Sequence, residues 1–216
     1  MNKIQLIGNK LYKSFGKQGW WPLTIEGYES KHHSGGPKTD KHRFEIIIGA
    51  ILTQNTNWKN VEKALYNLSK NNLININKIK RIKKERLAQL IKSAGYYNQK
   101  AERLKLIADF LFQNKNPTRE QLLDVKGIGP ETADSILLYA YNKPFFVIDA
   151  YTKRIFERLD YKAKNYDGWQ RLFMDNLRKD TELFKEYHAL LVELGKNNCK
   201  KKAICKECPV KEFCKK

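Results

Sequence analysis

The string V-K-G-I-G-P at residues 125–130 limits the possible folds of this chain more than any other stretch. Its two glycines, on either side of Ile128, permit a tight turn with positive φ, and its proline suits the first turn of a helix. We therefore expect one helix to end at Val125 and a second to run over residues 131–140, with Ile128 filling the space between them. Backbone N–H groups at the start of the second helix would face outward, an arrangement that binds phosphate.

Apolar residues elsewhere recur at the three- and four-residue spacing of a helix. Leu104, Ile107 and Leu111 follow this spacing, and an apolar segment runs over residues 44–51. Thr118 and Gln121 have the spacing of a capping box, which marks a helix start. Alternating strand patterns are scarce, so the sequence predicts an all-α protein.

The charge balance indicates a polyanionic partner. Lysines and arginines number 42 against 23 aspartates and glutamates, which gives a net charge of +19. Because each contact of a Lys or Arg with a phosphate releases condensed counterions, a nucleic acid is the natural partner; a generally basic soluble surface is the alternative. No apolar run approaches the ~18 residues of a membrane span, and we find no signal peptide. We expect a cytoplasmic, nucleoid-associated protein without a membrane partner.

All four cysteines lie near the end of the chain, as Cys199, Cys205, Cys208 and Cys214 in the pattern C-x5-C-x2-C-x5-C. A disulfide scaffold would spread its cysteines along a small secreted chain, so this clustering favours a metal site. Four thiolates in this pattern can hold a [4Fe–4S] cluster. Zinc is the alternative, although zinc sites usually pair two C-x2-C units and this chain has one.

Several motifs together resemble the endonuclease III superfamily of helix–hairpin–helix (HhH-GPD) DNA glycosylases. Residues 122–137 resemble the helix–hairpin–helix itself, and residues 146–155 resemble the segment that carries the catalytic aspartate. Residues 48–56 resemble the helix end with a strand-probing glutamine, and residues 95–101 resemble the intercalating loop. The cysteines resemble the iron–sulfur loop, with a first gap one residue shorter than the family pattern. The resemblance runs from about residue 40 to residue 214, with the motifs in family order.

This resemblance implies two helical domains with a DNA-binding cleft between them. A six-helix barrel with the helix–hairpin–helix would occupy residues 31–149, and residues 1–30 with 150–216 would form a helical domain that ends in the [4Fe–4S] loop. The implied partner is double-stranded DNA that contains a damaged base, bound by a monomer. A non-catalytic DNA-binding or redox-sensing iron–sulfur module is a rival interpretation.

The implied catalytic residue is Asp149. A carboxylate stabilises the oxocarbenium-like transition state of glycosidic cleavage and can orient or deprotonate a nucleophile. A plain helix N-cap is the alternative role, and one side chain can do both. Once the base has flipped out, Gln54 and Tyr96 are expected to fill the gap in the duplex. The remaining predicted DNA contacts lie in the hairpin and are Val125, Lys126, Gly127, Ile128, Gly129 and Thr132.

Position 131 bears on the type of reaction. The lyase members of the superfamily have a lysine here that forms a Schiff base with the sugar, whereas this chain has Glu131. A carboxylate cannot form an imine. We therefore expect a monofunctional glycosylase that uses water and leaves an abasic site; an endonuclease III-like glycosylase/AP lyase is the alternative.

The pair Trp20–Trp21 before Pro22 resembles a base-pocket segment of the 3-methyladenine branch of the superfamily. Phe44 is a candidate for the facing aromatic ring, and Glu131 completes the predicted pocket. Electron-rich rings favour electron-poor alkylated purines, so these lesions are the expected substrates. Burial of the two tryptophans as core is the structural alternative. The functional alternative is a glycosylase that removes thymine or uracil from mismatches.

Overall fold

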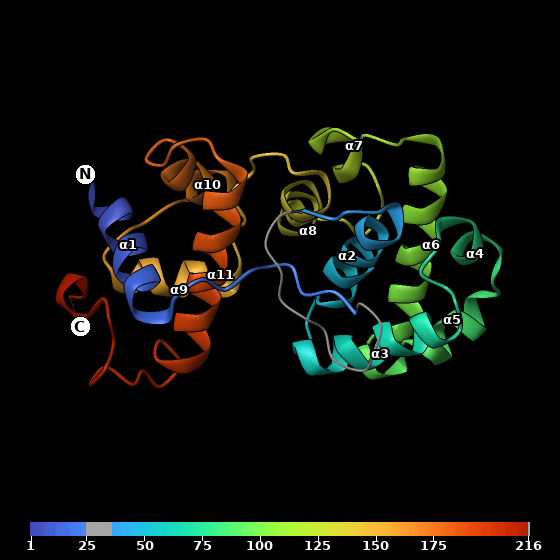
Figure 1. The fold of residues 1–216 in the computed structure, drawn as a ribbon, viewed down its shortest axis with the longest axis horizontal. Coiled ribbons are helices and arrows are strands. Elements are labelled where there is room, and N and C mark those ends of the chain that lie inside the picture. Colours follow the sequence, from blue (N-terminus) through green and yellow to red (C-terminus); the bar gives the residue numbers. More distant parts are fainter. Residues whose placement is uncertain (25–35, 216) are drawn as a thin grey trace. The chain divides into compact units, whose positions relative to one another are not determined.

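The computed structural model describes residues 1–24 and 36–215 of the chain. Every regular element of three or more residues in these ranges is a helix, which confirms the predicted all-α fold (Figure 1). None of the described helices is long and apolar enough to cross a membrane. The chain divides into two compact units. We call Trp21–Asn142 the central unit, and Met1–Trp20 with Lys143–Lys216 the terminal unit.

The central unit is built around α2 (Asp40–Leu52). All nine residues from Phe44 to Leu52 are buried, which is typical of a helix that neighbours surround on every side. Those neighbours include α3, α6, α8 and η2. The other helices are α3 (Trp58–Lys70), α4 (Ile76–Arg81), α5 (Lys84–Leu90), η1 (Lys92–Ala94), α6 (Tyr97–Gln113), α7 (Arg119–Leu123), α8 (Pro130–Ser135) and η2 (Ile136–Ala140, π-helical).

The terminal unit joins the two ends of the chain. Its helices are α1 (Lys3–Phe15), α9 (Ala150–Arg158), α10 (Tyr166–Met174), α11 (Thr181–Asn197) and η3 (Lys211–Phe213). The helix α11 contacts both α1 and α9, and the blue N-terminal helix lies with the orange C-terminal helices in Figure 1. The Tyr187 hydroxyl donates a hydrogen bond of 2.7 Å to the Ile4 carbonyl, so α11 and α1 are linked inside this core.

Aromatic packing explains why residues 143–149 belong to the terminal unit. The rings of Phe146 and Phe173 are stacked with their centroids 4.0 Å apart, and Phe184 and Tyr187 meet Phe146 edge to face. Such ring pairs contribute beyond the area they bury. The sequence placed this boundary at residue 149. The other predicted boundary, between residues 30 and 31, lies outside the described residues, and the domain bounds stay a prediction.

Candidate functional site

The hairpin forms at the predicted residues, although α7 ends at Leu123, two residues before the expected end at Val125. Thr118 and Gln121 make the predicted capping box at the start of α7, and Pro130 is the first residue of α8. Helical structure continues through η2 to Ala140, as expected, but changes from α to π at Ile136. Of the two glycines, Gly127 has the positive φ that the tight turn allows (88°), whereas Gly129 has an ordinary extended conformation with φ −94° as the N-cap.

The two glycines of the hairpin meet different surroundings. A Cβ on Gly127 would lie 2.5 Å from Nε of Arg103, so this glycine is needed for a close approach. A Cβ on Gly129 would have no heavy atom within 4 Å. No acceptor for the Gly129 N–H lies within hydrogen-bond distance among the described residues. The open face of the hairpin is therefore at Gly129.

Some of the remaining hairpin residues are buried, and others lie at the surface. Val125, Ile128 and Thr132 are buried, and the burial of Ile128 agrees with its predicted position between the two helices. Lys126 is exposed, and its Nζ lies 3.1 Å from the Glu102 carboxylate. That pair lowers the pKa of Glu102 below its usual range, mainly through the hydrogen bond from Lys126.

An ion pair joins the two helices of the hairpin. Arg119 at the start of α7 donates to Asp134 of α8, with Nε 2.8 Å from Oδ1 and a second nitrogen 3.3 Å from Oδ2. Asp134 is completely buried. Because the contact is bidentate, it sets the orientation of α7 against α8 as well as their distance.

Gln54 lies against the hairpin. Its Nε2 donates to the Gly127 carbonyl at 3.2 Å and to Oγ1 of Thr132 at 2.9 Å. Its Oε1 accepts a short hydrogen bond from Arg103. All of its amide atoms are thus engaged within the central unit, so insertion into DNA would require these hydrogen bonds to open. The strand-probing role of Gln54 stays a prediction.

A buried lysine connects the end of α2 to the predicted intercalating loop. Nζ of Lys100 donates to the carbonyls of Leu52 at 2.8 Å and Ala94 at 2.7 Å. Burial, with a smaller contribution from Arg103, lowers the pKa of Lys100 to about 8. Beyond Ala94, Tyr96 adopts a left-handed conformation with φ 45°, and 66% of its surface is exposed. Tyr96 is thus available to contact a ligand.

Asp149 is the N-cap of α9 in the terminal unit. Its Oδ1 accepts a hydrogen bond of 2.7 Å from the Thr152 N–H, and 14% of its side chain is exposed. The preceding backbone is held by Gln170, which donates to the Phe146 carbonyl at 2.8 Å, and by Tyr166, whose hydroxyl accepts from the Ile148 N–H at 3.3 Å. The predicted cap is therefore confirmed, and it presents a carboxylate on a rigid backbone.

His188, which no sequence pattern pointed to, lies beside Asp149. Nε2 of this α11 residue is 3.8 Å from Oδ2 of Asp149. Trp20 meets the imidazole edge to face, with the ring centroids 6.1 Å apart, and Nζ of Lys196 lies 5.6 Å from the centroid of the Trp20 ring. Burial lowers the pKa of His188, while Asp149 opposes the shift. A lone histidine in an amphipathic helix carries no sequence signal for this contact.

The predicted base-pocket residues fall in both units. Trp20 belongs to the terminal unit with Asp149, whereas Trp21 lies in the central unit, where its ring packs against Trp58 and Tyr139. A Cβ on Gly49 would lie 3.1 Å from Trp21, so α2 approaches this ring closely.

Three further residues were predicted for the pocket. Pro22 and Phe44 are buried in the central unit, and Phe44 lines a cavity of about 270 Å³ with Arg43 and Tyr141. Glu131 is exposed at the second position of α8. The joint pocket stays a prediction.

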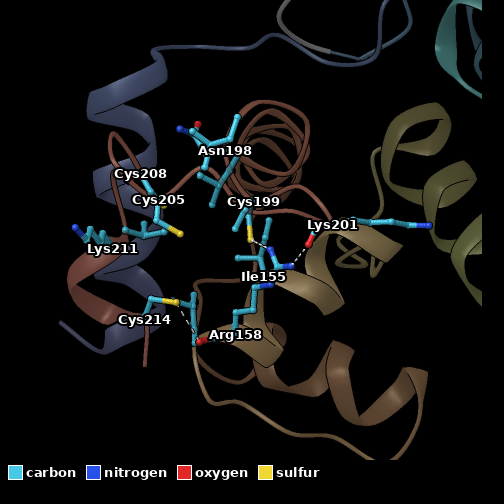
Figure 2. A pocket seen from close by; sticks show the side chains of 14 residues that line it. Ile155, Arg158, Asn198, Cys199, Lys201, Cys205, Cys208, Lys211 and Cys214 are labelled. Carbon is cyan, nitrogen blue, oxygen red and sulfur yellow. Dashed lines mark hydrogen bonds between the residues drawn. The ribbon is translucent and has the colours of Figure 1, made fainter. Parts of the chain in front are cut away.

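The four cysteines line one cavity of about 250 Å³ in the terminal unit, and all four are free thiols (Figure 2). Apolar residues, including Ile155, Leu159 and Val210, form part of its wall. Within residues 1–24 and 36–215, no three potential ligands converge closely enough to hold a single metal ion. The metal site at these cysteines therefore stays a prediction.

Arginine side chains of α9 hold the cysteine loop. Arg158 donates to Sγ of Cys199 at 3.1 Å and to the carbonyls of Lys200 and Lys201, as Figure 2 shows in part. Arg154 donates to the carbonyl of Cys199 at 2.8 Å. Burial raises the pKa of the Cys208 thiol. A positively charged ligand would offset that burial cost and favour the thiolate.

The fold and the hairpin define a helix–hairpin–helix protein, and comparison with known proteins identifies the family. The model of the HhH-GPD superfamily of base excision DNA repair proteins matches residues 48–179. A protein of Methanocaldococcus jannaschii described as a candidate DNA repair glycosylase is 45% identical over 99% of this chain and 97% of its own length. The chain belongs to the HhH-GPD superfamily of base excision DNA repair proteins.

Solved structures show the same fold. The 3-methyladenine DNA glycosylase of H. pylori, bound to 1,N6-ethenoadenine, matches with a TM-score of 0.72 and 28% identity. The match covers 91% of this chain and 98% of that one. Endonuclease III in a non-covalent DNA complex matches with a TM-score of 0.81 and 20% identity, over 100% of this chain and 96% of that one. The predicted endonuclease III-like fold is thus confirmed.

Proposed function

We propose that this protein is a DNA N-glycosylase that flips a damaged base out of the duplex and hydrolyses its glycosidic bond with Asp149. The observation that carries this proposal is the Asp149 carboxylate, which is largely buried and held by the Thr152 N–H on the anchored start of α9. A preorganised negative charge stabilises the positive charge that develops on the sugar as the base leaves. Oδ2 remains available to orient or deprotonate water.

The hairpin would bind the phosphate backbone through Gly129. This residue combines an N–H without an acceptor among the described residues with an open approach, at the start of the helical segment that begins with Pro130. Such N–H groups bind phosphate in a way that is independent of sequence. The net charge of +19 favours the same partner.

Substitution of the two hairpin glycines separates binding from folding. We expect Gly129→Ala to fold like the native protein, because its φ is ordinary and its surroundings are open. Its methyl group would hinder the phosphate and weaken DNA binding roughly 5- to 30-fold, the equivalent of a hydrogen bond worth about 1–2 kcal/mol. Gly127→Ala should instead lower the melting temperature, because it combines positive φ with a clash against Arg103. Fluorescence anisotropy and thermal unfolding measure the two effects; native-like DNA affinity of Gly129→Ala would contradict the assignment.

We propose further that the enzyme is monofunctional. Glu131 occupies the position where lyase members have a lysine, and its carboxylate cannot form a Schiff base. Borohydride trapping on damaged and abasic duplexes is expected to yield no covalent adduct with the native protein. Glu131→Lys is the matched positive control, because it places an amine at the same position of α8. Strong trapping of the native protein would show that another lysine acts as the nucleophile.

Alkylated purines such as 3-methyladenine are the proposed substrates. Trp20 packs edge to face against His188, the neighbour of Asp149, and an electron-rich ring at this site would favour an electron-poor base. The similarity to the H. pylori 3-methyladenine DNA glycosylase supports the same class. Duplexes with 3-methyladenine, 7-methylguanine, G·T, G·U and thymine glycol test this proposal. Release from the first two is expected; release confined to the mismatches or to thymine glycol would instead indicate the mismatch or endonuclease III-like alternative.

We propose that the four cysteines hold a [4Fe–4S] cluster with a structural role. The donor set fits, because four free thiols line one cavity and Arg158 donates to the sulfur of Cys199. The cluster would keep the basic loop that contains Lys200, Lys201 and Lys202 in one conformation for phosphate contact. Purified protein should absorb near ~400 nm. Zinc without this band would overturn the assignment, and unchanged DNA affinity after oxidative loss of the cluster would overturn its structural role.

A further inference from the structure

The carboxylate of Asp149 is approached from two directions within the terminal unit. The N–H of Thr152 binds Oδ1 from the first turn of α9. Nε2 of His188 lies 3.8 Å from Oδ2 on the side of α11. Both side chains are largely buried, with 14% of Asp149 and 6% of His188 exposed. Two contacts on different oxygens restrain the rotation of a carboxylate. A single cap contact on Oδ1 would leave the carboxylate free to rotate about that contact.

The position of His188 is itself set by packing. The preceding residue, Tyr187, is buried in the aromatic core and donates to the Ile4 carbonyl. At the other end of α11, a Cβ on Gly195 would lie 2.3 Å from the Tyr151 ring, so α9 and α11 approach closely there. Trp20 packs edge to face against the imidazole. The backbone before Trp20 is held by Glu186 of α11, whose carboxylate accepts a hydrogen bond of 3.3 Å from the Gly19 N–H. The imidazole is therefore a rigid reference point for Asp149.

We propose that His188 is a positioning residue, which orients the Asp149 carboxylate by directing Nε2–H toward Oδ2. The inference rests on the proposed glycosylase function. A neutral imidazole can donate to a carboxylate without cancelling its negative charge, and that charge is what the transition state requires. The 3.8 Å separation of Nε2 and Oδ2 is longer than a hydrogen bond, and the proposal requires it to shorten when substrate binds, as catalytic contacts commonly do.

The chemistry of His188 favours the neutral form. Burial lowers its pKa, and the neighbouring cation Lys196 acts in the same direction, while Asp149 acts against them. A neutral histidine has a single N–H, and its place on Nε2 or Nδ1 decides whether it can serve Asp149. This requirement makes the proposal testable without any measurement of activity.

The first experiment determines the tautomer. In protein labelled with 15N-histidine, NMR at neutral pH should show His188 with the proton on Nε2, and Asp149→Asn should shift the Nε2 signal. A proton on Nδ1, or an Nε2 signal that Asp149→Asn leaves in place, would overturn the proposal even if the protein releases bases. If the predicted spectra appear but no base is released from any lesion duplex, the positioning contact stands and the proposed glycosylase function fails.

The second experiment compares two substitutions of the imidazole. His188→Leu keeps the bulk but removes the donor, so the single-turnover rate of base release should fall about 10- to 100-fold while the Kd for DNA is unchanged. His188→Gln can place an amide N–H near the original Nε2 position and should recover most of the rate. In the Asp149→Asn background, His188→Leu should cause no further loss. If His188→Leu and His188→Gln lost the same share of the rate of base release, and both also lowered the melting temperature, His188 would have a purely structural role.

Discussion

Replacement of Asp149 with asparagine is expected to lower the rate of base release roughly 1,000-fold, the scale of a lost electrostatic contact to a transition state. Asparagine has an oxygen that can still accept from the Thr152 N–H, and it caps helices as well as aspartate does. Stability should therefore change little. The substitution removes the negative charge, so DNA affinity should be unchanged or slightly tighter. Single-turnover release from a 3-methyladenine duplex, beside anisotropy with the same duplex, measures both quantities.

The terminal unit offers a matched control for this substitution. Asp180 is the N-cap of α11, and its Oδ1 accepts from the Leu183 N–H at 3.0 Å, just as Asp149 caps α9. Asp180→Asn therefore makes the same chemical change at the same kind of position, and it should leave base release at the native rate. If Asp149→Asn retained the native rate as well, Asp149 would be a cap alone. The non-catalytic DNA-binding module would then be favoured.

Removal of the buried carboxylate in Asp134→Ala is expected to destabilise the protein by about 3–5 kcal/mol. The substitution leaves Arg119, whose side chain is only 16% exposed, without its bidentate partner, and it creates a cavity in the hairpin. For a chain of this length the melting temperature should fall by roughly 6–20 °C. Circular dichroism during thermal unfolding measures the loss. DNA affinity should fall with it, because α7 and α8 no longer hold the turn.

Glu102→Gln is the control, because it removes the α6 partner of the hairpin residue Lys126. The Lys126–Glu102 pair lies at the surface, with 82% and 43% of the two side chains exposed, and exposed pairs contribute little to stability. We expect no measurable change in melting temperature, and slightly tighter DNA binding because Lys126 loses a competing anion. An Asp134→Ala protein that unfolds at the native temperature would show that the α7–α8 ion pair does not set the geometry of the hairpin.

The predictions that succeeded rest on residues a few positions apart. Thr118 and Gln121 form a capping box at the start of α7, Pro130 begins α8 and Asp149 caps α9, all as local rules indicate. The two hairpin glycines have different roles, because only Gly127 adopts positive φ. Gly129 is instead an N-cap, and its missing side chain serves an open approach rather than an unusual backbone angle.

Other features depend on contacts between distant segments. Trp20 and Trp21 are neighbours in the chain, yet the first contacts His188 and the second packs against Trp58 and Tyr139. The hydrogen bonds of Gln54 to Gly127 and Thr132 join residues more than 70 positions apart. No spacing rule predicts such pairs, because they arise only after the helices have packed.

The helical class, the hairpin, the cap at Asp149 and the grouping of the cysteines follow from the sequence alone, because each depends on short-range geometry or on composition. The contact of His188 with Asp149, the Arg119–Asp134 pair and the hydrogen bonds that hold Gln54 against the hairpin depend on the packing of distant segments. These contacts join separate helices, and the packing of buried side chains sets the distances between those helices. Local sequence therefore placed the catalytic candidate at Asp149, while long-range packing supplied the histidine beside it.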